Sequence, residues 1–163
     1  MTKTPIATTT PADPLSPKPG LETAPPPGQP LCKGTALTVT DADTIVTPSY
    51  KREVFAVRTT GRPCQLNGYP TVQLLDASGK PLPVKVEHGG HGLPAERPAT
   101  YTLSRETSLS FEIGTARDGA CRDVTSASVV LPQTSTAHRA ATPLQVCGGA
   151  VGVSPVHRKA DSE

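Results

Sequence analysis

Aromatic side chains are scarce in this chain, and tryptophan is absent. The 163 residues include two Phe, three Tyr and one Met. A folded core must therefore be built from Val, Leu, Ile and Ala, a set of small and often β-branched side chains that favours β-structure. The 16 basic and 14 acidic residues leave a formal net charge of only +2. Without a basic field, nucleic acid is not expected as a partner.

Two kinds of hydrophobic segment are also missing. No stretch of about 18 apolar residues exists, so the sequence predicts no transmembrane segment. The first 30 residues lack the apolar run that marks a signal peptide. The chain is therefore expected to be cytosolic, or to be exported by a signal that has been removed or lies upstream of residue 1.

Proline is abundant, and its distribution divides the chain. Nine of the 19 prolines lie in residues 1–30, among Thr, Ala, Lys and Gly. Such a segment has too little apolar surface to offset the entropy lost on ordering, so we predict a disordered Pro/Thr-rich tether over 1–31. The candidate domain is 32–155, which is long enough to bury a core. Residues 156–163 form a polar tail.

Four cysteines lie in the candidate domain: Cys32, Cys64, Cys121 and Cys147. They contain no C-x-x-C pair, so a zinc ribbon or a thioredoxin-like site has no support. Lipidation of Cys32 has little support, because Gln29-Pro30-Leu31 is a poor lipobox. Sequence alone allows three disulfide pairings, and the alternative is four buried free thiols.

Hairpin geometry favours one pairing. Strands are expected at 34–40 and 51–58, joined by an Asp-Ala-Asp turn. In an antiparallel pair the start of the first strand lies beside the end of the second, which places Cys32 next to Cys64. The sequence therefore predicts a Cys32–Cys64 disulfide.

The same reasoning applies near the C-terminus. Strands near 124–131 and 143–147 place Cys121 beside Cys147. Each predicted disulfide closes a loop of about 30 residues and stabilises the fold by roughly 3.5 kcal/mol in the chain-entropy model. Two disulfides imply an oxidising compartment.

Alternation of apolar and polar residues predicts strands elsewhere. In 108–114 we expect the Leu, Phe and Ile side chains to face inward and the Ser and Glu side chains outward. Residues 76–80 form a turn in which Gly79 supplies a positive φ. Eight or nine short strands without a helical stripe predict an all-β fold, an Ig-like antiparallel β-sandwich.

The stretch C-Q-L-N-G-Y-P, residues 64–70, follows a predicted strand and precedes an apolar strand that ends in Leu-Asp before a Gly turn. This arrangement resembles an actinobacterial domain-of-unknown-function family of exported and lipid-anchored proteins. The matching residues are Cys64, Leu66, Gly68, Tyr69, Pro70, Leu74, Leu75, Asp76, Gly79, Cys121, Leu131-Pro132 and Val146-Cys147-Gly148. The resemblance covers 32–155 and implies an exported β-sandwich without an established activity. The chain departs from the family at 103–106, where Leu-Ser-Arg-Glu replaces a Leu-x-Pro-Gly turn.

Gly68, Tyr69 and Pro70 form a predicted structural corner. Gly68 gives backbone freedom, Tyr69 packs over the end of the sandwich, and Pro70 fixes entry into the next strand. The alternative is that Tyr69 stacks on a ligand. A structural role is preferred, because a tyrosine at such a corner usually ties its hydroxyl to the backbone.

The segment 88–92, His-Gly-Gly-His-Gly, is the part of the sequence that most resembles a functional site. His88 and His91 could hold a metal if further ligands joined them, but a loop in solvent is the preferred interpretation. Ser154 is not in a G-x-S-x-G elbow. His138 and His157 would act as bases only if folding placed them beside a nucleophile. We therefore expect no catalytic residue, no metal site and no cofactor.

These patterns favour a non-catalytic, exported cell-envelope or extracellular module with a binding or structural role. We expect a monomer, and an envelope or extracellular protein or glycan as its partner. The alternatives are a small secreted hydrolase and a metal-handling protein, both using His88 and His91.

Overall fold

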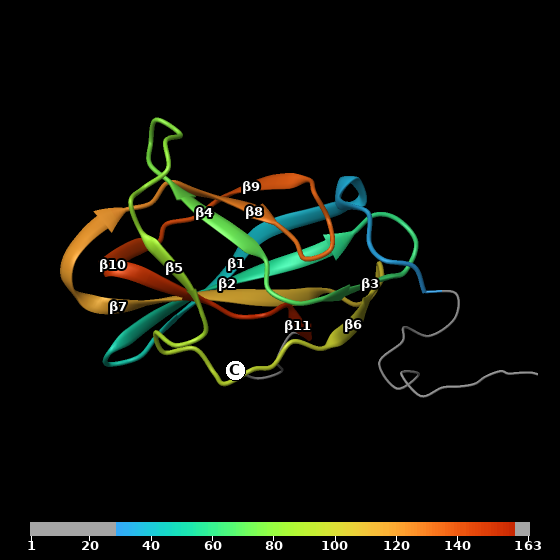
Figure 1. The fold of residues 1–163 in the computed structure, drawn as a ribbon, viewed down its shortest axis with the longest axis horizontal. Helices are drawn as coiled ribbons and strands as arrows, with labels where there is room; N and C mark the ends of the chain where they lie inside the picture. Colours follow the sequence, from blue (N-terminus) through green and yellow to red (C-terminus); the bar gives the residue numbers. More distant parts are fainter. Residues whose placement is uncertain (1–28, 159–163) are drawn as a thin grey trace, which may run out of the picture.

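The computed structural model describes residues 29–158. The predicted tether up to residue 28 and the tail from 159 onward lie outside the described residues. The described chain is an all-β sandwich, as the sequence predicted (Figure 1). Its one helical element is a 3₁₀ turn, η3 (Gly34–Ala36). Its strands are β1 (Leu37–Val46), β2 (Tyr50–Thr59), β3 (Cys64–Asn67), β4 (Thr71–Leu75), β5 (Lys85–His88), β6 (Thr100–Leu103), β7 (Leu109–Asp123), β8 (Ser126–Val130), β9 (Ala137–Ala141), β10 (Gln145–Val153) and β11 (His157–Arg158).

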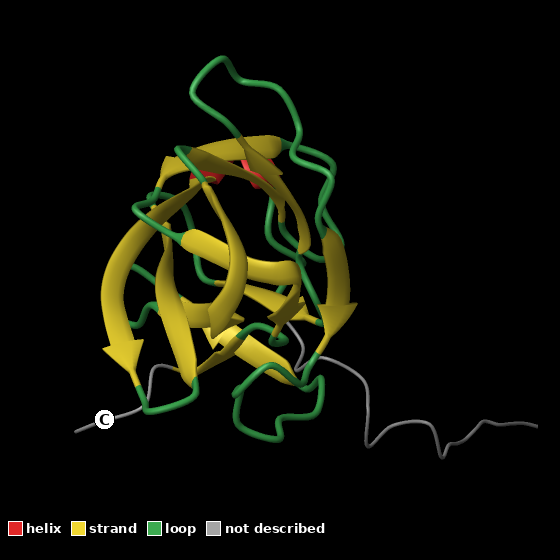
Figure 2. Cartoon of the chain, turned by 90° about the vertical axis from the view of Figure 1, so that its left-hand side faces the viewer, coloured by secondary structure: helices red, strands yellow, loops and turns green. Residues whose placement is uncertain are grey.

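The strands form one large sheet and two smaller ones. The large sheet has the order β1-β2-β7-β10-β5, with β11 added beside β7. The sheet β4-β8-β9 faces it across the core, and the pair β3-β6 lies at one end (Figure 1 and Figure 2). All strand pairs are antiparallel except β5 with β10, which is parallel. The chain crosses from the smaller sheet to the large one between β4 and β5. In the large sheet, β5 then lies parallel to β10.

The β1–β2 hairpin is longer than predicted. Its register runs from Leu37 opposite Thr59 to Val46 opposite Lys51. The Asp-Ala-Asp segment, 41–43, is a bulge inside β1 and not the turn. The strand continues because Thr, Ile and Val follow the bulge. The turn is Thr47-Pro48-Ser49, closed by a 2.8 Å hydrogen bond from the Thr47 N–H to the carbonyl of Tyr50.

A stack of two aromatic rings occupies the centre of the core. The rings of Phe55 and Phe111 lie 5.1 Å apart and within 6° of parallel. The core includes Phe55 and Val57 of β2 and, on β7, Leu109, Phe111 and Ile113, so the inward positions of 109–113 are confirmed. The expected exposure of the alternate positions is wrong, because Ser110 and Glu112 are only 2% and 7% exposed. Other parts of the chain cover this second face of β7.

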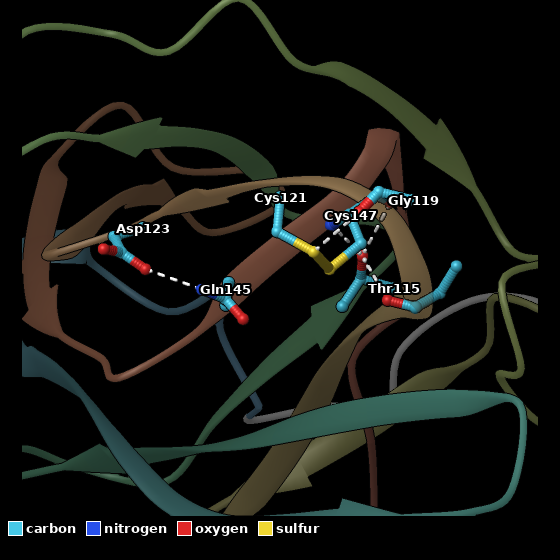
Figure 3. Close-up of a disulfide and its surroundings, with 7 residues drawn as sticks. Thr115, Gly119, Cys121, Asp123, Gln145 and Cys147 are labelled. Atoms are coloured by element: carbon cyan, nitrogen blue, oxygen red, sulfur yellow. Dashed lines mark hydrogen bonds between the residues drawn. A yellow bond between two sulfur atoms is a disulfide. The ribbon is translucent and has the colours of Figure 1, made fainter.

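Both predicted disulfides are present, Cys32–Cys64 and Cys121–Cys147. The first closes the β1–β2 hairpin as expected. The second joins β10 to β7 and not to a strand at 124–131 (Figure 3). Residues 117–121 bulge out of β7, because Val146 pairs with Arg122 whereas Cys147 pairs with Ala116. Gly148 and Gly149 lie inside β10. The packed chain also continues past residue 155, since Val156 and His157 are buried.

Candidate functional site

A groove lies on the outer face of the large sheet, on the side away from the aromatic core. Its volume is about 340 Å³, within the range of sites that bind small molecules. The lining residues are Ala42, Asp43, Ile45, Arg52, Val54, Ala56, Arg58, Pro94, Glu96, Ser108, Ser110, Glu112 and His157. The first seven come from β1 and β2, and the β5–β6 segment supplies Pro94 and Glu96. That segment runs along the lower side of the molecule in Figure 1.

The strand register explains why these side chains converge. Successive residues of a strand point to opposite faces, so β2 sends Phe55 and Val57 into the core and Val54 and Ala56 into the groove. Across the sheet, Val54 pairs with Glu112 and Ala56 with Ser110. On the far side of β7, His157 of β11 also pairs with Ser110. The floor therefore runs from β1 through β2 and β7 to β11.

An ionic cluster occupies one end of the floor. Nη1 of Arg52 donates a 2.8 Å hydrogen bond to Oε1 of Glu112. Nε2 of His157 lies 3.5 Å from Oε2 of the same carboxylate, an ion-pair distance that is long for a hydrogen bond. Burial opposes ionisation of Glu112, but His157 and the charge of Arg52 outweigh it and hold the pKa of Glu112 below its usual value. Burial also opposes the charge on His157, but Glu112 and the carbonyl of Arg158 raise its pKa.

One ring nitrogen of His157 is committed to the backbone. Nδ1 lies 2.8 Å from the carbonyl oxygen of Arg158, and a carbonyl can only accept, so Nδ1 carries the proton. Nε2 faces the carboxylate of Glu112. A serine nucleophile needs a histidine nitrogen within hydrogen-bond reach to take its proton. Ser110 lines the same groove, but Nε2 of His157 is directed at Glu112, and no hydrogen bond joins it to the Ser110 hydroxyl.

The Ser154 hydroxyl is likewise structural. Its Oγ accepts a 2.8 Å hydrogen bond from the backbone N–H of Glu112 and donates to the carbonyl of Pro155. It thereby ties the chain before β11 to β7 and helps to place His157 over the sheet.

Two glycines allow the β5–β6 segment to close over the sheet. Gly114 of β7 and Gly152 of β10 lie opposite each other. A Cβ at Gly114 would overlap the carbonyl oxygen of His91, and one at Gly152 would overlap that of Gly89. The loop backbone therefore rests directly on the sheet at this point. The segment 88–92, expected as a loop in solvent, is instead anchored to the domain, and its Gly92 packs with a φ of +84° against the ring of Tyr50.

The two loop histidines do not form a metal centre. Nε2 of His91 lies 2.7 Å from Oε1 of Glu87, and this contact lowers the pKa of Glu87. The ring of His88 stacks on Tyr69, with centroids 3.9 Å apart and the planes within 3°. Nowhere in residues 29–158 do three His, Cys, Asp or Glu side chains gather closely enough to hold a metal ion.

The predicted corner lies close to this loop. Gly68 has a φ of +125°, and its carbonyl oxygen accepts a 2.9 Å hydrogen bond from the N–H of Val156. Pro70 is buried and Tyr69 is half-buried. Tyr69 covers the base of the 88–92 loop through its stack on His88. The corner therefore joins the start of β4 to the chain that leads into β11.

Two neighbouring carboxyl groups, those of Glu53 and Asp41, interact at the inner face of the sheet. Glu53 of β2 is fully buried, and its Oε2 accepts a 2.8 Å hydrogen bond from the hydroxyl of Thr44. Burial and the neighbouring Asp41 raise the pKa of Glu53 to about 7. Oδ2 of Asp41 in turn accepts a 2.7 Å hydrogen bond from the hydroxyl of Thr142, just past β9. This pair therefore links the two faces of the sandwich.

Sequence reasoning missed the groove. The sequence predicts that Glu112 faces solvent and that His157 belongs to a polar tail, and it indicates no role for Arg52. The one available signal was the unbroken apolar run over 54–57, which makes both faces of that strand apolar and so indicates that both are covered. The covering segment is remote in sequence, so nothing local predicted it.

The described residues contain no helix long and apolar enough to cross a membrane. A family model described as a domain of unknown function, DUF4232, matches residues 32–157. No curated protein and no solved structure gives a match. The matched range spans the whole sandwich, including both disulfides and the groove. The chain therefore belongs to the DUF4232 family of domains of unknown function.

Proposed function

We propose that this protein is an exported binding module that acts in the cell envelope or outside the cell, without catalytic activity of its own. Two disulfides pair all four cysteines of the domain. Disulfides form and persist in oxidising compartments and are rare in the cytosol, which supports export.

The observation that carries the binding role is the groove with its ionic cluster. It is concave, partly apolar, and holds a few converging polar groups, as ligand sites generally do. The same cluster supports a role without catalysis. The imidazole of His157 is held by Glu112 on one side and by the Arg158 carbonyl on the other. Such a group can fix a ligand. No hydrogen bond joins its Nε2 to Ser110, so the contact that activates a serine nucleophile is missing.

The alternative of a secreted hydrolase that uses the loop histidines has less support, because His91 is paired with Glu87 and His88 is stacked on Tyr69. A panel of ester and glycoside substrates tests it. We expect turnover no faster than that of heat-denatured protein. Turnover that His91→Ala or His157→Ala abolishes would replace the binding role with an enzymatic one.

Export and partners are tested in the native host. Non-reducing peptide mapping should recover the two disulfide-linked peptides from the envelope or medium fraction. Crosslinking followed by purification should capture an envelope or extracellular protein or glycan. Recovery of four free thiols from the cytosolic fraction would overturn the proposal.

A further inference from the structure

Two polar groups on the floor of the groove have no hydrogen-bond partner among the described residues. They are Nε2 of His157 and Nε of Arg52. His157 is only 6% exposed, so little water reaches its ring. Leaving a buried donor unpaired costs about 1–3 kcal/mol, and more when the group is charged. Both side chains contact the carboxylate of Glu112, which places the two unpaired groups in the same part of the floor.

The buried charges at this end of the groove are not balanced. Protonated His157 and Arg52 give two positive charges against the single negative charge of Glu112. Asp43 and Glu96 line the groove, but both are exposed, so solvent and salt screen them. The excess positive charge therefore lies at the floor of the groove, whereas the acidic side chains of Asp43 and Glu96 lie at its rim. This arrangement favours an anion at the floor.

An apolar strip leads away from the two donors. Along β2, the residues that face the groove between Arg52 and the exposed Arg58 are Val54 and Ala56. Outward positions of a strand recur every two residues, so this strip extends about 13 Å from Arg52. Ile45 of β1 and Pro94 of the covering segment line the same groove. A buried ionic cluster at one end, followed by an apolar strip along the groove, favours an amphipathic ligand.

We propose that the groove binds a small amphipathic anion, with a carboxylate that accepts from Nε of Arg52 and Nε2 of His157 and an aliphatic chain over Val54, Ala56 and Ile45. This assignment rests on the proposed function, since it takes the groove as the binding site. It adds the chemical class of the ligand. A carboxylate has two acceptor oxygens and so pairs with two donors at once.

The first experiment compares head groups on the unmodified full-length protein. Octanoate, 1-octanol and octylammonium share one chain and differ in charge, and calorimetry at pH 6.5 measures the affinity of each. We expect octanoate to bind at least tenfold more tightly than the other two, which is about 1.4 kcal/mol. If octanol bound as tightly as octanoate, the groove would remain a binding site, but the proposed preference for an anion would be refuted. Failure of all three to bind would overturn the groove itself.

Variants then locate the two halves of the ligand. His157→Gln should weaken octanoate at least tenfold and leave octanol unchanged, whereas His138→Gln, on β9 outside the groove, should change neither. Ile45→Asn should weaken both ligands, whereas Val46→Asn should weaken neither, because Val46 lies on the same strand but is 55% exposed and outside the groove. Thermal melting confirms that each variant is folded. Equal octanoate affinity for His157→Gln and the unmodified protein would contradict the proposal.

Discussion

The buried carboxyl group of Glu53 makes the stability of this domain depend on pH. The side chain is 0% exposed on the inner face of β2, beside Asp41 and Lys51. Burial, with the Asp41 carboxyl adding to it, raises the pKa of Glu53 from 4.5 to about 7, while Thr44 and Lys51 oppose the change. The folded state therefore binds a proton more tightly than the unfolded chain does.

The sign and size of the effect follow from linkage. Between pH 4.5 and 7 the folded state holds the Glu53 proton and the unfolded state has lost it, so stability falls as pH rises. A shift from 4.5 to about 7 at 1.36 kcal/mol per unit corresponds to about 3 kcal/mol at most. Below pH 4.5 the contribution is fully present. Above pH 7 its loss is complete.

Two other groups act in neighbouring windows. The raised pKa of His157 also removes stability as pH rises, but only above the ordinary histidine value of 6.5. The lowered pKa of Glu112 acts in the opposite sense, since its contribution is present above 4.5 and is lost as pH falls below that value. Between pH 5 and 6.5 the slope therefore belongs to Glu53.

Urea unfolding of the unmodified protein and of Glu53→Gln measures this slope. Glutamine keeps the shape of the side chain and its hydrogen bonds but cannot ionise. We expect the unmodified protein to lose about 2 kcal/mol between pH 5 and 6.5, and the variant to lose almost none. Glu106→Gln, at an exposed position, serves as the control and should follow the unmodified protein. A slope in Glu53→Gln as steep as in the unmodified protein would refute the reasoning.

Three further predictions concern the scaffold and the loop histidines. Replacing Cys121 and Cys147 by Ser, 26 residues apart, should lower the free energy of unfolding by about 3.5 kcal/mol; an unchanged urea midpoint would contradict it. Gly114→Ala should cost about 1–3 kcal/mol and weaken protection of amides 89–93 in hydrogen exchange, because its Cβ displaces the carbonyl of His91. Calorimetry with Ni²⁺ or Zn²⁺ should show no binding tighter than about micromolar, because Glu87 holds His91; nanomolar binding lost in His91→Ala would restore a metal site.

The fold class could be predicted because its signals are local. Strand alternation around Phe111 and the turn at Gly79 depend on residues close together in the chain. The paired cysteines lie 32 and 26 residues apart, but their placement at hairpin ends indicates the pairing. The Cys121–Cys147 pairing was predicted correctly with the wrong neighbouring strand. Both the predicted and the observed arrangement bring the start of one strand beside the end of another. The predicted disulfide is therefore correct although the predicted strand pairing is wrong.

The groove could not be predicted, because it depends on pairings that no local pattern encodes. Arg52 and Glu112 carry charge at outward positions, which alone predicts contact with solvent. They become buried only because β11 pairs with β7 and because the segment after β5 lies on Gly114 and Gly152. The two glycines show their role only when the loop that rests on them is known.

The amino-acid sequence by itself determined the all-β class, the two disulfides and the inward face of the strands, since side-chain periodicity and hairpin closure are properties of neighbouring residues. The tertiary structure alone decided that the opposite face is covered, that His157 lies beside Glu112, and that burial raises the pKa of Glu53 to about 7. Those outcomes depend on solvent exclusion by segments distant in the chain, and a charge loses its hydration only when such segments meet around it.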